Sequence, residues 1–459
     1  MDNKQFIAGL IEKARAAQSK FETFDQRAVD KVCLAIAKCI YDNAEILAEE
    51  AVAETGMGDV QSKIRKQRVI TMSHFDHVKG KKSVGIIEED PELQVVTYAK
   101  PIGVIACITP TTNPTSTACG NGVYAVKSRN ALIVAPHPRA KKCTAHAVHI
   151  IREAMEKAGG FADLMQVIEE PTVELSQLLM ASCDATIATG GPGMVKAAYS
   201  SGRPSFGVGG GNCQSFFDRG VKDLYDEYAI CTIRCKNIDG GVQCNGEQCL
   251  HLPAEEESAV LDAFKRQNAV IIEDEATLNK IREVLFLPNG GFNPKFVGLP
   301  TAKLAEAFGI QAPANTTLFL LKASGNAHDD LLCREKLCLC TSYLPYKTFE
   351  EGVNTGLINL KHAGAGHSAV IFSYDKAHID YVAKTWPVGR LSVNIGNNVA
   401  GGNSASIGYN PTISLGCGTW GGNSISENLT YRHLMNMTKV GTVLKDAPGY
   451  DPEKVFTLD

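Results

Sequence analysis

The sequence of 459 residues lacks the features that mark membrane-spanning, secreted or nucleic-acid-binding proteins. No apolar run approaches the length of about 20 residues that a membrane helix needs, so we expect no membrane span. The formal net charge is only −4 and the basic residues are scattered, which excludes an electrostatic case for binding nucleic acid or an anionic membrane. The first residues, Met-Asp-Asn-Lys-Gln-Phe, are polar and lack the apolar centre of a signal peptide.

Cysteine is abundant, with 15 residues, but no Cys-x-x-Cys pair is present. Cys338-x-Cys340 and Cys231-x-x-x-Cys235 have no matching second pair of ligands, so we expect no zinc site. The count is odd, and the cysteines are spread through apolar segments without the spacing of a disulfide framework. We therefore expect reduced thiols and a cytoplasmic protein.

The spacing of apolar residues predicts an α/β protein. Residues 1–80 have apolar side chains at helical spacing, and residues 85–102 predict two extended segments around a proline-containing turn. Short apolar runs then alternate with helical stretches, at 103–108, 131–135, 164–168, 186–189, 269–272, 317–321 and 368–372. Such runs between helices indicate parallel sheets covered on both faces, which is the doubly wound architecture of nucleotide-binding domains.

Two of these runs end in loops that could carry chemistry. Gly190-Gly-Pro-Gly193 follows the run at 186–189, and glycines there let a pyrophosphate approach the backbone and the N-terminus of the next helix. Glycine turns between a strand and a helix are also common in proteins that bind no ligand there. The run at 103–108 ends in Thr109-Pro-Thr-Thr-Asn-Pro114, where Asn113 is either a rigidly held donor to an oxyanion or only the start of a turn.

Cys244 lies in Gly-Gly-Val-Gln-Cys-Asn-Gly-Glu-Gln-Cys, residues 240–249, where small and polar neighbours allow close approach to its sulfur. A thiol with an ordinary pKa of about 8.5 becomes a useful nucleophile when backbone amides or positive charge lower that value. Cys249 is the competing cysteine, but it precedes an apolar stretch and is predicted to pack in the core. His251 and His367 are candidate bases, although a single histidine is more often structural. Glu335 in Arg-Glu-Lys-Leu-Cys could hold a ribose hydroxyl or lie on the surface.

These segments, in this order, resemble the CoA-acylating branch of the aldehyde dehydrogenase superfamily. That branch includes the acylating dehydrogenases of acetaldehyde, propionaldehyde, succinate semialdehyde and sulfoacetaldehyde. The resemblance spans nearly the whole chain. Its most specific segments are Ile-Thr-Pro-Thr-Thr-Asn-Pro (108–114), Ala-Pro-His-Pro-Arg-Ala-Lys-Lys (135–142), Lys-Ala-Ala-Tyr-Ser-Ser-Gly-Arg (196–203), Arg-Glu-Lys-Leu-Cys (334–338) and Leu-Gly-Cys-Gly-Thr-Trp-Gly-Gly-Asn-Ser-Ile-Ser-Glu-Asn (415–428).

The resemblance implies a role for each of these segments. Cys244 would be the nucleophile, and Asn113 would stabilise the oxyanion together with the backbone amide of Cys244. Gly190 and Gly193 would lie by the coenzyme pyrophosphate, Glu335 would hold the nicotinamide ribose, and residues 136–139 would line the adenosine end. The full set of coenzyme-binding residues that we expect is Thr109, Pro110, His137, Pro138, Arg139, Gly190, Gly191, Gly193, Gly209 and Glu335.

One difference from the hydrolytic aldehyde dehydrogenases predicts the acyl acceptor. Those enzymes carry a water-activating glutamate in a Glu-Leu-Gly-Gly segment, whereas this chain has Gly207-Val-Gly-Gly210. Water, with a pKa of about 15.7, needs a strong base or a metal to attack a thioester, but a thiol with a pKa of about 8.5 does not. We therefore expect a reversible reaction of a short-chain aldehyde, CoA and NAD or NADP through a Cys244 thioester. The alternatives are a hydrolytic enzyme that forms the free acid, or a dinucleotide-binding protein without catalysis.

The resemblance also implies an organisation of the chain. We expect a coenzyme-binding domain at 1–228 with an extended arm at about 85–102, a catalytic domain at 229–425, and a C-terminal return with an oligomerisation segment at 426–459. Family precedent is a homodimer or homotetramer. No added peptide precedes the first helix of the family pattern, which disfavours delivery to a microcompartment.

The aldehyde itself stays open, since uncharged, carboxylated and sulfonated aldehydes all fit. Arg203, Arg234 and Arg390 are candidate partners for an anionic aldehyde. A coenzyme phosphate could meet the small basic cluster of Arg139, Lys141 and Lys142.

Overall fold

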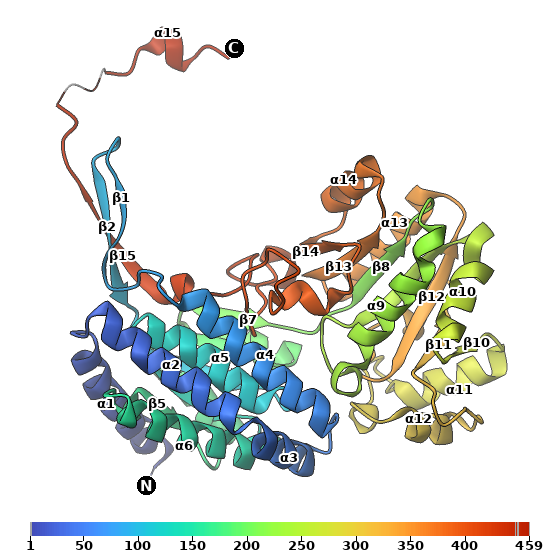
Figure 1. The fold of residues 1–459 in the computed structure, drawn as a ribbon, viewed down its shortest axis with the longest axis horizontal. Helices are drawn as coiled ribbons and strands as arrows, with labels where there is room; N and C mark the ends of the chain where they lie inside the picture. Colours follow the sequence, from blue (N-terminus) through green and yellow to red (C-terminus); the bar gives the residue numbers. More distant parts are fainter. Residues whose placement is uncertain (1, 446, 448, 459) are drawn as a thin grey trace.

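The computed structural model of the chain describes residues 2–445, 447 and 449–458. Two α/β lobes lie side by side, and a hairpin arm with the C-terminal segment projects from the first lobe (Figure 1). Within the described part of the chain, no helix combines the length and the apolarity that crossing a membrane requires.

The first lobe contains a five-stranded parallel sheet with the order β5-β4-β3-β6-β7. Its strands are β3 (Val104–Thr109), β4 (Ala131–Pro136), β5 (Met165–Val167), β6 (Ala185–Thr189) and β7 (Ser205–Val208). All residues of β3 and β4 are buried, which explains their continuous apolar runs. The chain builds outward from β3 to β5 on one side and then returns to add β6 and β7 on the other. The crevice at this reversal, outside the carboxyl ends of β3 and β6, is where doubly wound sheets bind their ligands.

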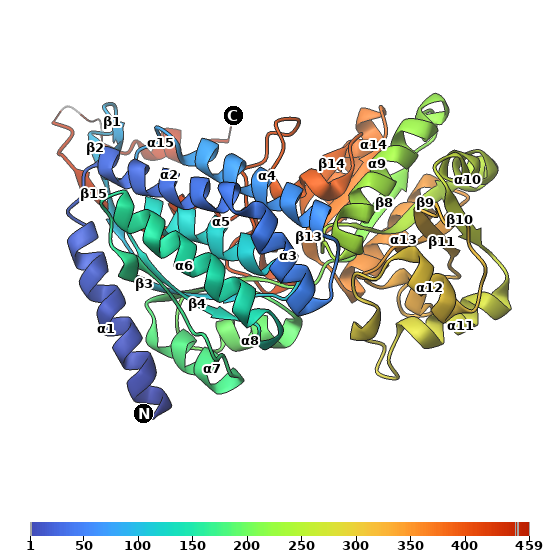
Figure 2. The same ribbon diagram turned by 60° about the horizontal axis from the view of Figure 1, so that its bottom comes forward.

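Helices cover both faces of this sheet, with α2, α5 and α6 on one face and α1, α7 and α8 on the other (Figure 2). Aspartate side chains begin two of the helices, since Asp25 accepts from Ala28 N and Asp59 accepts from Ser62 N, each at 2.8 Å. The helices of this lobe are α1 (Asn3–Phe21), α2 (Gln26–Asp42), α3 (Ala44–Thr55), α4 (Val60–Val78), α5 (Pro114–Lys127), α6 (Lys141–Lys157), α7 (Val173–Ser182) and α8 (Pro192–Tyr199).

The second lobe contains a seven-stranded parallel sheet with the order β10-β11-β12-β9-β8-β13-β14. Its strands are β8 (Cys213–Phe217), β9 (Glu247–Pro253), β10 (Ala269–Ile272), β11 (Leu318–Lys322), β12 (Cys340–Tyr346), β13 (Gly366–Phe372) and β14 (Val388–Val393). Its helices are α9 (Tyr225–Asn237), α10 (Glu257–Arg266), α11 (Glu275–Leu285), α12 (Thr301–Phe308), α13 (Phe349–His362) and α14 (Lys376–Thr385).

The arm is a three-stranded antiparallel sheet with the order β1-β2-β15. It joins β1 (Gly85–Asp90) and β2 (Val95–Pro101) to β15 (Met435–Gly441), and the short helix α15 (Pro452–Val455) follows near the end of the chain. The C-terminal segment extends away from both lobes (Figure 1). Its large side chains are exposed, including Tyr450 and Phe456.

The α/β class, the parallel sheets and the hairpin at 85–102 are confirmed. All fifteen cysteines are free in the structure. The domain limits stay a proposal. Because β8 pairs with β9 and β13 of the second sheet, the structure favours moving the first limit from residue 228 back to residues 209–212. Residues 446, 448 and 459 of the proposed C-terminal segment lie outside the described residues.

Candidate active site

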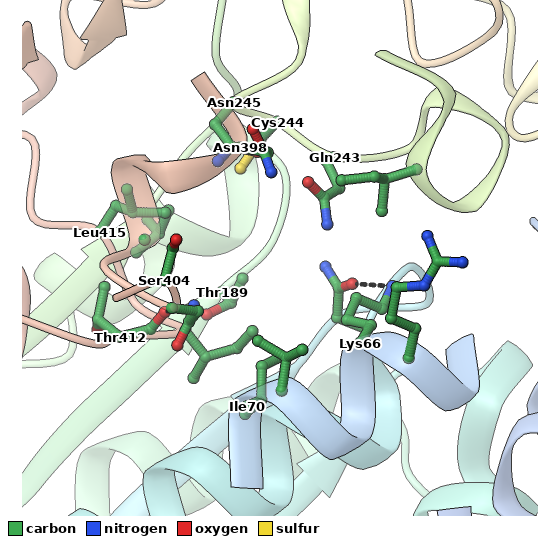
Figure 3. Close-up of a pocket in the computed structure, with 18 of the residues that line it drawn as sticks. Lys66, Ile70, Thr189, Gln243, Cys244, Asn245, Asn398, Ser404, Thr412 and Leu415 are labelled. Atoms are coloured by element: carbon green, nitrogen blue, oxygen red, sulfur yellow. Dashed lines mark hydrogen bonds between the residues drawn. The ribbon is translucent and has the colours of Figure 1, made fainter. Parts of the chain in front are cut away.

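A cavity of about 290 Å³ is lined by residues from both lobes. Cys244, Asn245 and Asn398 lie on one side of it, and Lys66 and Ile70 of α4 lie on the other (Figure 3). Its walls are largely apolar, and the described residues that line it include no carboxylate. The lining residues are Ser62, Arg65, Lys66, Val69, Ile70, Asn113, Thr189, Val208, Ile238, Gln243, Cys244, Asn245, Asn398, Gly401, Asn403, Ser404, Thr412, Ile413 and Leu415.

Cys244 lies in the turn between the short 3-10 helix η4 (Ile238–Gly241) and β9. Its Sγ is 3.2 Å from Nε2 of the buried His367. The other imidazole nitrogen, Nδ1, is 2.8 Å from Ser368 Oγ, which also accepts a hydrogen bond from Asn397 Nδ2 at 2.9 Å. With its proton on Nδ1, the imidazole donates to Ser368 and leaves Nε2 to accept the thiol proton.

Burial makes this pair neutral. It raises the pKa of Cys244 to about 12, and the negative charge of Glu335 acts in the same direction. Burial also lowers the pKa of His367 to about 3, assisted by the positive charge of Arg390. The resting site is therefore a thiol beside an uncharged imidazole, and not a thiolate stabilised by positive charge.

The basic residues near Cys244 in sequence do not stabilise a thiolate. Lys236 donates to Gln248 Oε1 at 3.2 Å and to the carbonyl of Lys336 at 2.7 Å, and Arg234 is exposed. The expected competitor, Cys249, is buried in β9, as its apolar surroundings predicted. His251 is also buried and is 3.0 Å from Gln214 Oε1 through Nε2. Of the two candidate bases, only His367 contacts the sulfur of Cys244.

Asn113 lines the same cavity as Cys244. It is the N-cap residue of α5, yet its side chain makes no capping hydrogen bond. Its Oδ1 instead accepts from Lys66 Nζ at 2.5 Å. Cys244 and Asn113, which the sequence suggested as nucleophile and oxyanion donor, thus line one cavity from opposite lobes.

The crevice at the ends of β3 and β6 fits a dinucleotide. The hydroxyl oxygens of Thr109 and Thr189 are buried there without a hydrogen-bond partner among the described residues. Gly191 is the N-cap of α8, and a Cβ added at Gly191 or at Gly193 would meet no atom within 4 Å. The open backbone, the helix N-terminus and the unpaired hydroxyls suit a phosphate group. Gly190 and Pro110 lie in the same two loops.

The side chain of Glu335 contacts the glycine segment 209–211, which packs against Cys244. Its Oε1 accepts from Gly211 N at 2.9 Å, and a Cβ added at Gly210 would lie 2.8 Å from its Oε2. A Cβ at Gly211 would lie 2.1 Å from the carbonyl oxygen of Cys244. Gly209 lines a second cavity, of about 460 Å³, between α8 and the second lobe. Glu335 and Cys244 therefore flank one glycine segment, where a nicotinamide ribose and the reacting carbon could be neighbours.

The expected adenosine-binding residues follow β4 and lie apart from the cavity of Cys244. His137, Pro138 and Arg139 are exposed, and Arg139 donates to the carbonyl of Thr55 at 3.2 Å. Arg139 lines a separate hollow of about 220 Å³ that also includes Lys295. Within the expected basic cluster, Lys141 pairs with Glu170.

The position of the hydrolytic glutamate is closed by packing. Gly207 N donates to Tyr199 Oη at 2.9 Å. A Cβ added at Gly207 would lie 2.7 Å from Val195 Cγ1 and 2.8 Å from Tyr199 Cε2. Helix α8 thus occupies the space into which a side chain at residue 207 would have to extend.

The candidate partners for an anionic aldehyde lie elsewhere. Arg390 is buried and donates to the carbonyls of Gly366 and His367, and Arg203 donates to the carbonyl of Ala181. The cations that line the cavity are Arg65 and Lys66 of α4. Sequence reasoning treated this region only as helix. The available signal was Lys63 and Lys66 on the same helical face as the buried Gln67 and Ile70.

Comparison with known proteins agrees with this geometry. The sequence profile described as Aldehyde dehydrogenase family matches residues 2–205. The succinate-semialdehyde dehydrogenase (acetylating) of Clostridium kluyveri is 44% identical over 453 residues, which cover 98% of this chain and 99% of that protein. The chain belongs to the aldehyde dehydrogenase family.

Acylating members of the family match over nearly their whole length. The sulfoacetaldehyde dehydrogenase (acylating) of Bilophila wadsworthia is 34% identical, with 95% of this chain and 94% of that protein covered. The crystal structure of an acetylating aldehyde dehydrogenase from Geobacillus thermoglucosidasius superposes with a TM-score of 0.93 at 34% identity, covering 98% of each chain. The family, the acylating branch and the fold class expected from the sequence are confirmed.

Proposed function

We propose that the protein is a CoA-acylating aldehyde dehydrogenase that converts a short-chain aldehyde, CoA and NAD(P)+ reversibly into acyl-CoA and NAD(P)H. The observation that carries this proposal is the contact between Cys244 Sγ and His367 Nε2, at 3.2 Å, in a cavity that also contains Asn113. A nucleophile, a base and an amide donor in one apolar cavity are the groups that addition to a carbonyl requires.

The chain's own residues account for the first half of the reaction. Nε2 of His367 accepts the thiol proton as Cys244 Sγ bonds to the aldehyde carbon, and Asn113 Nδ2 donates to the oxygen that becomes negative. NAD(P)+, when bound, accepts the hydride from that carbon. The product is a thioester on Cys244, which waits for an acceptor.

The same residues favour a thiol as that acceptor. Neutral His367 is placed to accept the proton of an incoming CoA thiol, whose pKa of about 8.5 lies far below the pKa of about 15.7 of water. No carboxylate stands among the described residues that line the cavity, and packing closes the position at Gly207. These features support CoA over water.

We propose that the aldehyde carries an anionic group and that Arg65 binds it. The relatives described above act, by their names, on succinate semialdehyde and sulfoacetaldehyde, and both aldehydes are anions. Arg65 is exposed and lines the cavity. It forms no hydrogen bond or ion pair with other residues in the described part of the chain, so its guanidinium is available to a carboxylate or sulfonate.

A substrate panel tests both parts of the proposal. Succinate semialdehyde and butyraldehyde have the same number of carbons but differ in charge, and each is assayed with NAD+ or NADP+ for acyl-CoA and for free acid. We expect acyl-CoA as the product and a raised KM for succinate semialdehyde in Arg65→Gln, with the KM for butyraldehyde unchanged. Arg203→Gln is the matched control, because Arg203 is an exposed arginine outside the cavity. Free acid formed equally fast without CoA would refute the acylating function, and equal KM changes for both aldehydes would refute the role of Arg65.

We also propose that the chain forms a homo-oligomer through the arm. Support comes from the three-stranded sheet, which projects from the first lobe, and from the exposed Met437 and Val440 on β15 (Figure 1). Sedimentation of the whole protein tests this, and a monomer at micromolar concentration would refute it.

A cytoplasmic location stays a proposal, supported by fifteen free cysteines. Localisation of the tagged protein by microscopy tests it, and a location outside the cytoplasm would refute it.

A further inference from the structure

A buried cluster of two lysines and one aspartate links α4 to the two loops that form the active site. Asp239 Oδ2 accepts from Lys63 Nζ at 2.9 Å and also from Lys66 Nζ. The side chains of Lys63, Lys66 and Asp239 are only 4%, 7% and 0% exposed. Asp239 belongs to η4, which leads directly into the turn of Cys244. With both lysines protonated, the cluster has a net positive charge beside the cavity.

Lys66 also determines how the amide of Asn113 faces. Its ammonium is 2.5 Å from Asn113 Oδ1 and 3.4 Å from the carbonyl oxygen of Thr112. An ammonium can only donate, so Oδ1 of the amide must face Lys66 and Nδ2 must face away from it. The contact that Nδ2 makes, with Thr112 Oγ1 at 3.2 Å, uses one of its two hydrogens. The other hydrogen stays available to a ligand in the cavity.

The shape of η4 holds the aspartate against α4. Asp239 has φ 56° and ψ 41°, a left-handed conformation that few residues other than glycine adopt. Its Oδ1 accepts from Asp59 N at 3.3 Å. Residue 58 must be glycine here, because a Cβ would lie 1.7 Å from Asp239 Oδ1 and because its φ is +72°. The backbone conformations at residue 58 and at residue 239 therefore both accommodate this buried contact.

We propose that Lys66 is a positioning residue for the oxyanion donor Asn113 and that Asp239 holds Lys66 in place. The proposal rests on the proposed role of Asn113 in the reaction. Lys66 fixes Nδ2 toward the cavity, polarises its N–H bond, and places positive charge behind the amide where the aldehyde oxygen becomes negative. Asp239 also leads into the turn of Cys244. The cluster therefore fixes the position of the oxyanion donor relative to the nucleophile, across the two lobes.

Lys66→Met tests the proposal, since methionine keeps much of the side-chain length and removes the ammonium. Lys63→Met is the matched control, because Lys63 has similar burial and the same aspartate partner but does not contact Asn113. We measure single-turnover NAD(P)H formation without CoA over a range of succinate semialdehyde and of butyraldehyde concentrations, and take the half-saturating aldehyde concentration as KM. Thermal unfolding is measured alongside. Removal of one oxyanion donor costs about 100- to 1,000-fold in rate, so loss of its positioning should cost about 10- to 100-fold.

In Lys66→Met we expect an equal loss of rate for both aldehydes and a KM within about threefold of wild type. The loss of rate should be smaller in Lys63→Met, and Lys66→Arg should recover much of the rate. In a background of Asn113→Ala, Lys66→Met should cost almost nothing further, because its effect acts through that amide. Three outcomes overturn the proposal. The first is a loss confined to the KM for succinate semialdehyde, which would make Lys66 a ligand of the substrate anion. The second is a full additional loss from Lys66→Met in the Asn113→Ala background, and the third is no loss of rate from Lys66→Met in the otherwise wild-type protein.

Failure of the proposed function is distinguishable from failure of this inference. The readout stops at the first half of the reaction, which a hydrolytic enzyme would also perform. Wild-type protein that reduces NAD(P)+ but makes no acyl-CoA would refute the acylating function and leave the positioning test intact. Wild-type protein that reduces no coenzyme with any aldehyde would refute both.

Discussion

Replacing His367 with asparagine should remove the base that accepts the proton of Cys244. Burial raises the pKa of that thiol to about 12, so at pH 7.5 only about 1 molecule in 30,000 has the thiolate. A positioned base contributes about 100- to 10,000-fold in rate, and the contribution is largest when its pKa lies near the working pH. Because burial lowers the pKa of His367 to about 3, we expect the low end of that range, about 100-fold or about 3 kcal/mol. We therefore expect single-turnover NAD(P)H formation in His367→Asn to fall by that factor at neutral pH.

The pH dependence distinguishes a base from a structural residue. In the wild type, neither His367, with a pKa of about 3, nor Cys244, with a pKa of about 12, titrates between pH 6 and 9, so the rate should be nearly flat. In His367→Asn the rate should rise about tenfold per pH unit, because the thiolate fraction rises as the pH approaches the thiol pKa from below. Saturating coenzyme limits any contribution from Glu335, whose pKa burial raises to about 7.

His251→Asn is the control, since it removes an equally buried imidazole that contacts Gln214 and not Cys244. It should lower thermal stability without making the rate pH-dependent. A loss of less than threefold in His367→Asn, or a flat pH profile in that variant, would refute the assignment of His367 as the base.

Three further changes probe the site. In His367→Asn, alkylation of Cys244 by iodoacetamide should accelerate about tenfold per pH unit up to pH 10, as the raised pKa of the thiol requires, and a plateau near pH 7 would contradict the neutral thiol. Gly207→Glu should not create a hydrolytic enzyme, because overpacking against Tyr199 should destabilise the fold by about 1–3 kcal/mol; a stable variant whose main product is free acid would show otherwise. Glu335→Gln should raise the KM for NAD(P)+ about 10- to 100-fold with little change in the KM for CoA, and an unchanged coenzyme KM would exclude a ribose contact.

Local sequence patterns predicted the elements that position the site. The continuous apolar runs of β3 and β6 indicated buried parallel strands, and the loops after them could be located because each begins where its run ends. Cys244 stood out since its neighbours are small and polar. These features depend on residues close in sequence, which is why the sequence alone could identify them.

The sequence offered His251 and His367 as candidate bases but could not show which of them reaches the proposed nucleophile. His367 reaches Cys244 across the parallel pairing of β8 with β13, a contact over 123 residues of sequence. Lys66 reaches Asn113 from a helix that precedes the sheet, and its basic side chain resembles any surface lysine until the fold buries it. The raised pKa of Cys244 arises from the same kind of burial, which the small and polar neighbours of this residue in sequence did not reveal.

Mass spectrometry of the enzyme after reaction with succinate semialdehyde and NAD(P)+, with CoA withheld, can locate the acyl group. We expect fragmentation of the peptide that holds Cys244 and Cys249 to place a succinyl group on Cys244, and we expect added CoA to remove it with the formation of an equal amount of succinyl-CoA. An adduct on Cys249, or full coenzyme reduction with an unmodified Cys244 at every time point, would contradict a thioester held on that sulfur.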